Sequence, residues 1–175
     1  ADNPAGYDPT RFEVSVLATE LQRPMELAVS HDGRIYYIEL DGKLKRLDPK
    51  SEVMETLAEL TVTTEQENGL IGIALDPQFE MNHWIYLQYS PPDYPGQHIS
   101  RFTLAGDKLD LASENLLFRF EEQRKECCHH AGSMAFGPDG CLYIGTGDNT
   151  HPGGDSAGYA PIDERPDRAP FDAQK

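Results

Sequence analysis

The sequence has 175 residues, and its 30 Asp and Glu outnumber its 15 Lys and Arg, which gives a formal net charge of −15. This charge disfavours electrostatic attachment to nucleic acid or to anionic lipid, so a small neutral substrate, a metal ion or a basic partner fits better. No apolar run approaches the roughly 18 residues that a membrane span requires. The first residues lack the basic and apolar regions of a signal peptide, so we expect a soluble chain or a mature product whose signal is gone.

A pattern of an apolar strand, a turn containing Asp with Gly or Pro, and a second strand rich in aromatic and β-branched residues occurs three times. The copies lie near residues 27–38, 72–89 and 133–144, and alignment on their alanines places them 46 and 61 residues apart, at Ala28, Ala74 and Ala135. Further strands are predicted at 12–17, 53–57, 99–104 and 115–120. No segment has a persuasive helical pattern, and 51–60 is read as an outer strand because of its place in the repeat.

The spacing of the repeat is typical of a β-propeller, an all-β fold of four-stranded antiparallel blades. A propeller closes with about four to eight blades, so three copies supply roughly half a ring. Residues 149–175 are rich in Gly, Pro and Asp and have no strand pattern. We therefore interpret residues 1–175 as the N-terminal part of one propeller domain, completed by a further segment, a second chain or another copy. The alternative is a small self-contained β-sandwich.

Several motifs resemble those of one enzyme family. They are Arg23-Pro24, the run from Glu67 to Ala74, Ile99 to Phe102, His129 to Gly132 leading into Phe136 to Gly140, and Gly147-Asp148. Over about residues 21–148 the chain looks like the glucose/sorbosone dehydrogenase family, six-bladed propellers that include sugar dehydrogenases using pyrroloquinoline quinone (PQQ). The resemblance implies a PQQ-dependent sugar or aldose dehydrogenase that oxidises an anomeric hydroxyl by base-assisted hydride transfer.

The resemblance also implies roles for individual residues. His129 stands seven residues before Phe136, the position of the family's general base. Asp148 matches the residue that can orient this base, and Glu67 is expected to face the substrate. His130 stands at a variable position, and we interpret it as a solvated or secondary polar residue near the substrate or cofactor.

Two of these positions depart from the family pattern. Cys128 replaces an Asp that commonly precedes the base, and Glu67 replaces a Gln. An ionised Glu only accepts hydrogen bonds, whereas Gln also donates them, so contacts to sugar or quinone would differ. These departures motivate an alternative function, a non-catalytic propeller that binds carbohydrate or a protein partner.

Three states are open for the adjacent residues Cys127 and Cys128. They can form a vicinal disulfide, remain free thiols, or bind zinc together with His129 and His130, in which case the segment would be a metal-binding or redox-sensing module. Consecutive residues of an extended segment point to opposite sides, which disfavours the zinc site. Cys141 is expected to pack as a small apolar residue.

The resemblance implies PQQ and Ca²⁺ as cofactors, with most of their binding residues in later blades. The acidic residues between Asp148 and Asp172 could hold calcium through oxygen ligands, although a solvated loop is the alternative. Expected partners are a small sugar and an electron acceptor such as a cytochrome c. A periplasmic or extracellular location is expected for such a protein.

Overall fold

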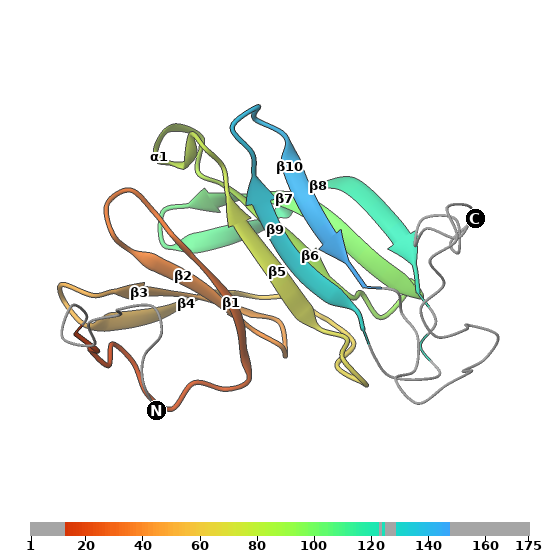
Figure 1. Cartoon of the computed structure of the whole chain (residues 1–175), viewed down its shortest axis with the longest axis horizontal. Helices are drawn as coiled ribbons and strands as arrows, with labels where there is room; N and C mark the ends of the chain where they lie inside the picture. Colours follow the sequence, from red (N-terminus) through yellow and green to blue (C-terminus); the bar gives the residue numbers. More distant parts are fainter. Residues whose placement is uncertain (1–12, 123, 125–128, 148–175) are drawn as a thin grey trace, which may run out of the picture.

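The computed structural model describes residues 13–122, 124 and 129–147, which form three antiparallel sheets (Figure 1). The first sheet has the order β1-β2-β3-β4 and the second β5-β6-β7-β8, while the third consists of β9 and β10. The strands are β1 (Pro24–Val29), β2 (Ile35–Glu39), β3 (Lys43–Asp48), β4 (Val53–Glu59), β5 (Leu70–Leu75), β6 (Trp84–Tyr89), β7 (Gly96–Ala105), β8 (Lys108–Glu121), β9 (Ala131–Phe136) and β10 (Leu142–Thr146). The two four-stranded sheets follow the chain order, so each is a meander of the kind predicted for a propeller blade, and β9 and β10 form a hairpin.

The three predicted copies of the repeat have equivalent strand pairing. Ala28 lies opposite Tyr36, Ala74 opposite Tyr86 and Ala135 opposite Tyr143. In every copy the pairing shifts register near the start of the first strand, between Pro24 and Leu27, between Leu70 and Gly72, and opposite the interval from Ile144 to Thr146. Such irregularities bend a strand and redirect its side chains. The repeat therefore fixes both the strand pairing and a bend at the same end of each sheet.

Two local predictions were wrong. Residues 13–17 of the predicted strand 12–17 form no strand, and Phe12 lies outside the described residues. The expectation of no helix fails at α1 (Phe79–Asn82), a single turn between β5 and β6. Asp76 Oδ1 stabilises this turn by accepting hydrogen bonds from Gln78 N at 2.9 Å and from Asn82 Nδ2 at 2.8 Å. The irregular tail predicted at 149–175 also lies outside the described residues.

Two apolar clusters join the sheets. The first lies between the first two sheets and includes the edge-to-face pair of Tyr36 and Phe79, whose ring centroids are 5.3 Å apart. The second joins the second sheet to the β9–β10 hairpin, where Tyr86 and Phe136 form a similar pair at 5.1 Å. Aromatic pairs of this kind contribute about 0.5–1.5 kcal/mol beyond the burial of their area. These aromatic side chains therefore act mainly in packing one blade against the next.

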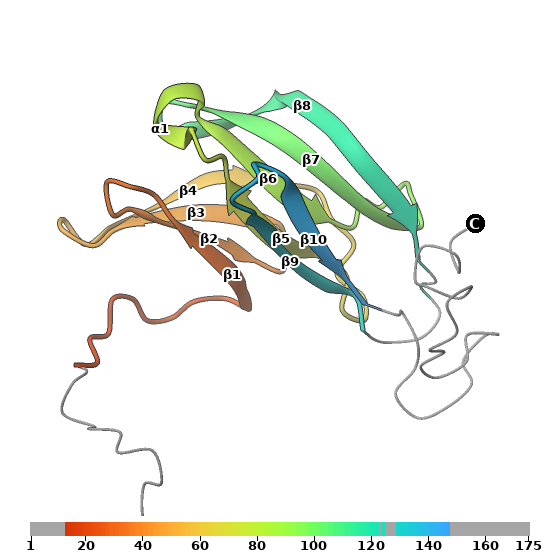
Figure 2. The same ribbon diagram turned by 45° about the horizontal axis from the view of Figure 1, so that its top comes forward.

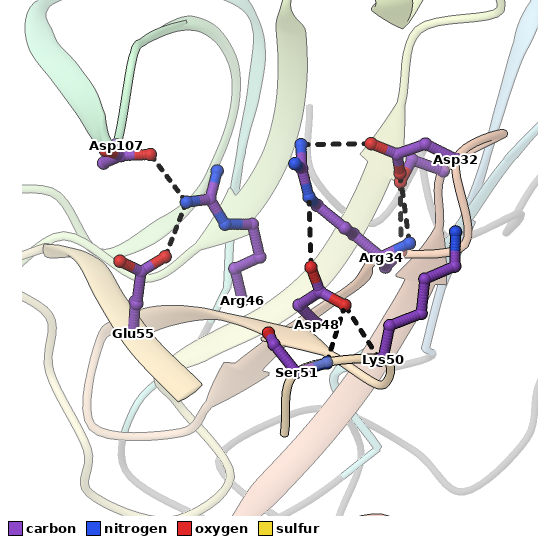
Figure 3. Close-up of polar contacts among 9 residues, drawn as sticks. Asp32, Arg34, Arg46, Asp48, Lys50, Ser51, Glu55 and Asp107 are labelled. Atoms are coloured by element: carbon purple, nitrogen blue, oxygen red, sulfur yellow. Dashed lines mark hydrogen bonds and ion pairs between the residues drawn. The ribbon is translucent and has the colours of Figure 1, made fainter. Parts of the chain in front are cut away.

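Arg46 of β3 ties the first sheet to the second (Figure 3). Its Nη2 lies 2.5 Å from Glu55 Oε2 in the same sheet and 2.7 Å from Asp107 Oδ1 in the β7–β8 turn. Burial lowers the pKa of Arg46, but the hydrogen bonds to Asp107 and Glu55 outweigh it, so the net change is upward. The nearby Arg34 is more exposed, and its ion pairs among the described residues are with Asp32 and Asp48 on the side of the first sheet.

Arg46→Met is expected to lower the free energy of unfolding by about 1.5 kcal/mol, since it removes charge-assisted hydrogen bonds that cross between sheets. Arg34→Met is the matched control, because an exposed pair contributes about 0–1 kcal/mol. Urea unfolding followed by circular dichroism measures both variants. Equal losses of unfolding free energy in the two variants would show that the ion pair between Arg46 and Asp107 stabilises the fold no more than an exposed pair does.

Candidate functional site

The first strands of the three sheets, β1, β5 and β9, lie side by side (Figure 2). Glu26 of β1 links them, because its Oε2 accepts a hydrogen bond from Ile73 N at 3.2 Å and its Oε1 accepts one from Ser133 Oγ at 2.8 Å. A groove of about 450 Å³ runs along these strands. These three strands therefore form one continuous wall.

The starting ends of β5 and β9 form the rim of this wall, which we define by Glu67, Asn68, His129 and His130. A Cβ atom on Gly72 would overlap the carbonyl oxygen of Gly132, so the two strands approach at backbone contact distance. Only glycine permits such an approach. The close contact brings residues near position 67 next to residues near position 130.

His129 lies on this rim with its side chain exposed. Its backbone has φ of 64°, a left-handed conformation that is uncommon for residues other than glycine. Asp148, the predicted orienting residue, lies outside the described residues, as do Cys127 and Cys128. The pairing of His129 with Asp148 and the state of the two cysteines therefore stay predictions.

Glu67 is exposed on the same rim, and its Oε2 lies 3.4 Å from the backbone nitrogen of His130, which donates to it. This contact joins two segments that are 63 residues apart in the sequence. Within the described part of the chain, no lysine or arginine forms an ion pair with Glu67. The rim therefore presents a carboxylate and an imidazole from two different blades.

His130 is buried, with 1% of its surface exposed, so the solvated interpretation of this residue is wrong. Its Nδ1 lies 2.9 Å from Glu122 Oε2, and both side chains are almost completely buried. Both oxygens of Glu122 also accept hydrogen bonds from Gln97 Nε2 at 2.9 Å. Gln97 Oε1 in turn accepts a short hydrogen bond from Gln88 Nε2.

The predicted site residues do not include Gln88, Gln97 and Glu122, although the sequence contains one signal for them. Gln88 interrupts an otherwise apolar and aromatic strand between Leu87 and Tyr89, and a buried polar residue in such a strand needs a partner. The partners could not be deduced because they come from β7 and from the segment after β8. Within the part of the chain that the structure describes, several buried side-chain atoms have no hydrogen-bond partner, among them Asn68 Oδ1, Gln88 Oε1, Ser90 Oγ, Arg124 Nε and His130 Nε2.

Arg124 is the basic residue nearest in sequence to the rim histidines among the described residues, but it is directed into the blade. Its Nη2 donates to the carbonyl oxygens of Pro91 at 2.9 Å and of Gly96 at 2.8 Å. Burial lowers the pKa of Arg124, although the charges of Glu122 and Asp93 oppose this effect. The guanidinium therefore supports the loop that carries Pro91 and Gly96.

Two further predictions concern cysteine and metal chemistry. Cys141 is exposed and precedes β10, so the prediction that it packs as a small apolar residue in the second strand of the hairpin was wrong. Residues 13–122, 124 and 129–147 contain no cluster of three or more His, Cys, Asp or Glu side chains that could hold a metal ion. The predicted acidic calcium loop lies outside these ranges, so it stays a prediction.

Comparison with known proteins supplies the family. The model of the glucose/sorbosone dehydrogenase family matches residues 21–159. The chain belongs to this family. The resemblance inferred from the motifs is thereby confirmed.

Relatives of this family member include an enzyme and a binding protein. Quinoprotein glucose dehydrogenase B of Acinetobacter calcoaceticus is 27% identical over 150 residues, which cover 78% of this chain and 31% of that protein. The human Hedgehog-interacting protein is also 27% identical, over 157 residues that cover 78% of this chain and 22% of that protein. The chain thus spans less than a third of either curated relative.

Solved structures confirm the propeller class. The PQQ-bound aldose sugar dehydrogenase of Streptomyces coelicolor aligns with a TM-score of 0.67 at 24% identity, over 84% of this chain and 52% of that one. An oxidoreductase (glucose dehydrogenase) of Thermus thermophilus aligns with a TM-score of 0.65 at 30% identity, over 74% of this chain and 38% of that one. The family member described here therefore has a sugar dehydrogenase-like propeller fold, and the β-sandwich alternative is excluded.

Proposed function

We propose that this chain forms part of the active site of a PQQ-dependent sugar or aldose dehydrogenase. The observation that carries the proposal is the rim itself, where the exposed Glu67 accepts a hydrogen bond from the backbone of His130, the chain neighbour of the exposed His129. When bound, PQQ would accept the hydride from the anomeric carbon of the sugar. The chain's own residues would bind the sugar and remove the hydroxyl proton.

His129 is the proposed base, because imidazole is the side chain best suited to accept a proton near neutral pH. Asp148 would hold the ring in the orientation that leaves one nitrogen ready for the sugar hydroxyl. Glu67 would accept hydrogen bonds from other hydroxyl groups of the sugar. In this arrangement Cys128 borders the substrate in place of the more usual carboxylate.

The residues of the rim suit the sugar better than they suit PQQ. They offer groups for the sugar, but PQQ carries carboxylates that need cationic partners, and Arg124 is engaged with backbone carbonyls. We therefore assign the residues that hold PQQ and Ca²⁺ to the remainder of the propeller. A cytochrome c or another acceptor would take the electrons, and the proposed location is periplasmic or extracellular. In the described residues, no helix is long and apolar enough to cross a membrane.

A non-catalytic propeller is the second candidate function. The similarity to the Hedgehog-interacting protein favours it, since that name describes a binding protein. Cys128 and Glu67, which depart from the pattern of the sugar dehydrogenases, favour it as well. In this case the rim would contact carbohydrate or a protein partner without oxidising it. A full-length protein whose other blades lack cationic residues toward the channel would match this function.

Dye reduction tests the proposal. The full-length protein, reconstituted with PQQ and Ca²⁺, is expected to reduce an artificial electron acceptor in the presence of at least one aldose from a panel of hexoses and pentoses. Protein without PQQ serves as the control, and circular dichroism verifies that both samples are folded. A folded, PQQ-loaded protein that oxidises no aldose would favour the binding function.

A further inference from the structure

A buried network of hydrogen-bonded side chains lies at the boundary between the second sheet and β9. It consists of Gln88, Gln97, Glu122 and His130. Gln88 belongs to β6, Gln97 to β7, and Glu122 follows β8, so three elements of one blade converge on the histidine of the next. Residues two positions away on the same strands, Tyr86, Ile99 and Phe120, belong to the apolar cluster between these blades. The hydrogen-bonded network is therefore the polar end of the interface between these two blades.

The backbone around His130 is held in an unfavourable conformation. His129 has φ of 64°, Ala131 of 59° and Gly132 of 142°. Left-handed backbone at residues other than glycine persists only where the surrounding structure imposes it. The turn from 129 to 132 therefore needs strong external contacts.

His130 supplies these contacts at three points. Its ring is bound to Glu122, its backbone N–H donates to Glu67 Oε2 at 3.4 Å, and its carbonyl oxygen accepts a hydrogen bond from Gly147 N at 3.3 Å. The ring contact is the strongest of the three, because it is short, buried and assisted by charge when either partner is ionised. The contacts of the buried His130 thus fix the backbone on both sides of it, including the backbone of the exposed His129.

We propose that His130 is a positioning residue, whose ring, clamped by Glu122, holds the turn from 129 to 132 so that His129 projects from the rim toward the sugar. The role in sugar oxidation rests on the proposed function. His130 would not touch the reacting atoms, because its ring is buried. Glu122 would act indirectly, because it orients the ring of His130 through a hydrogen bond, as residues around a metal site orient the ligands of the metal.

Two variants of the full-length protein test this role. His130→Asn keeps an N–H donor close to the position of Nδ1, so the bond to Glu122 can be retained. The double variant Glu122→Met with His130→Leu removes both polar groups together, which avoids leaving a buried charge without a partner. His31→Leu, a substitution of an exposed histidine in the β1–β2 turn, is the matched control.

The first measurement is hydrogen exchange of the amides at 129–132, which requires neither cofactor nor sugar. We expect exchange there to be at least about ten-fold faster in the double variant, with the first sheet unchanged. His130→Asn and the control are expected to exchange like the unmodified protein. Unchanged exchange in the double variant would overturn the proposal.

The second measurement is steady-state kinetics with PQQ and an aldose. The double variant is expected to lose about 10–100-fold in kcat while KM stays within about two-fold, and His130→Asn to stay within about three-fold in kcat. Faster exchange without a loss of kcat would also overturn the proposal, since the clamp would then be only structural. If the unmodified protein oxidises no sugar, the proposed function fails by itself, and the exchange measurement still decides whether His130 holds the turn.

Discussion

His129→Gln in the full-length protein is expected to lower kcat/KM for an aldose by about 10²–10⁴-fold, the usual contribution of a general base. Gln preserves much of the size and polarity of the side chain but cannot take the hydroxyl proton. The exposed position of His129 makes a large loss of stability unexpected, so the effect should fall on catalysis. Dye-linked kinetics with PQQ and Ca²⁺ measures it.

His31→Gln is the control for this prediction, because it makes the same chemical change at an exposed position in the β1–β2 turn. It is expected to leave kcat and KM unchanged. Full activity of the His129→Gln protein would show that another residue acts as the base. Such a result would leave the fold and the family untouched.

Gly72→Ala is expected to destabilise the fold by about 3 kcal/mol, the upper part of the range for overpacked sites. A Cβ atom at this position would overlap the carbonyl oxygen of Gly132, and a backbone oxygen cannot rotate away as a flexible side chain can. Relief would require β9 to move away from β5, which would also open the rim. Thermal or urea unfolding of the full-length protein measures the loss.

Gly145→Ala provides a matched comparison in β10. Among the residues that the structure describes, the nearest neighbour of an added Cβ there would be the carbonyl oxygen of Ser133 at 3.4 Å, which is an ordinary contact. This variant is expected to change the free energy of unfolding by less than about 0.5 kcal/mol. Similar stability of the two variants would show that β9 is free to shift relative to β5.

The sequence was sufficient for the features of the fold that depend on local pattern. Strand, turn and second strand occur together in each copy of the repeat, so the pairing of Ala28 with Tyr36 could be expected again at Ala74 and Ala135. The segment 13–17 was read incorrectly because a strand needs a hydrogen-bonding partner as well as an alternating pattern. Its residues have none among the described strands.

Only the site residues that stand in a family motif could be predicted from the sequence. His129 and Glu67 could be named from family resemblance, and the structure places both on one rim. The burial of His130 could not be foreseen, because it depends on Glu122, which is near in sequence but joined to it through the packing of two blades. Polar pairs of this kind leave no periodic signal in a single sequence.

In the proposed reaction, His129 would remove a proton from a sugar whose hydride passes to PQQ. Its most direct test is a single turnover, in which the PQQ-loaded full-length protein is mixed with excess aldose in the absence of an electron acceptor and the absorbance of the cofactor is followed. We expect one reduction per bound PQQ, slowed by about 10²–10⁴-fold in His129→Gln. Equal rates in the two proteins, or no reduction of PQQ by any aldose, would contradict the proposed reaction.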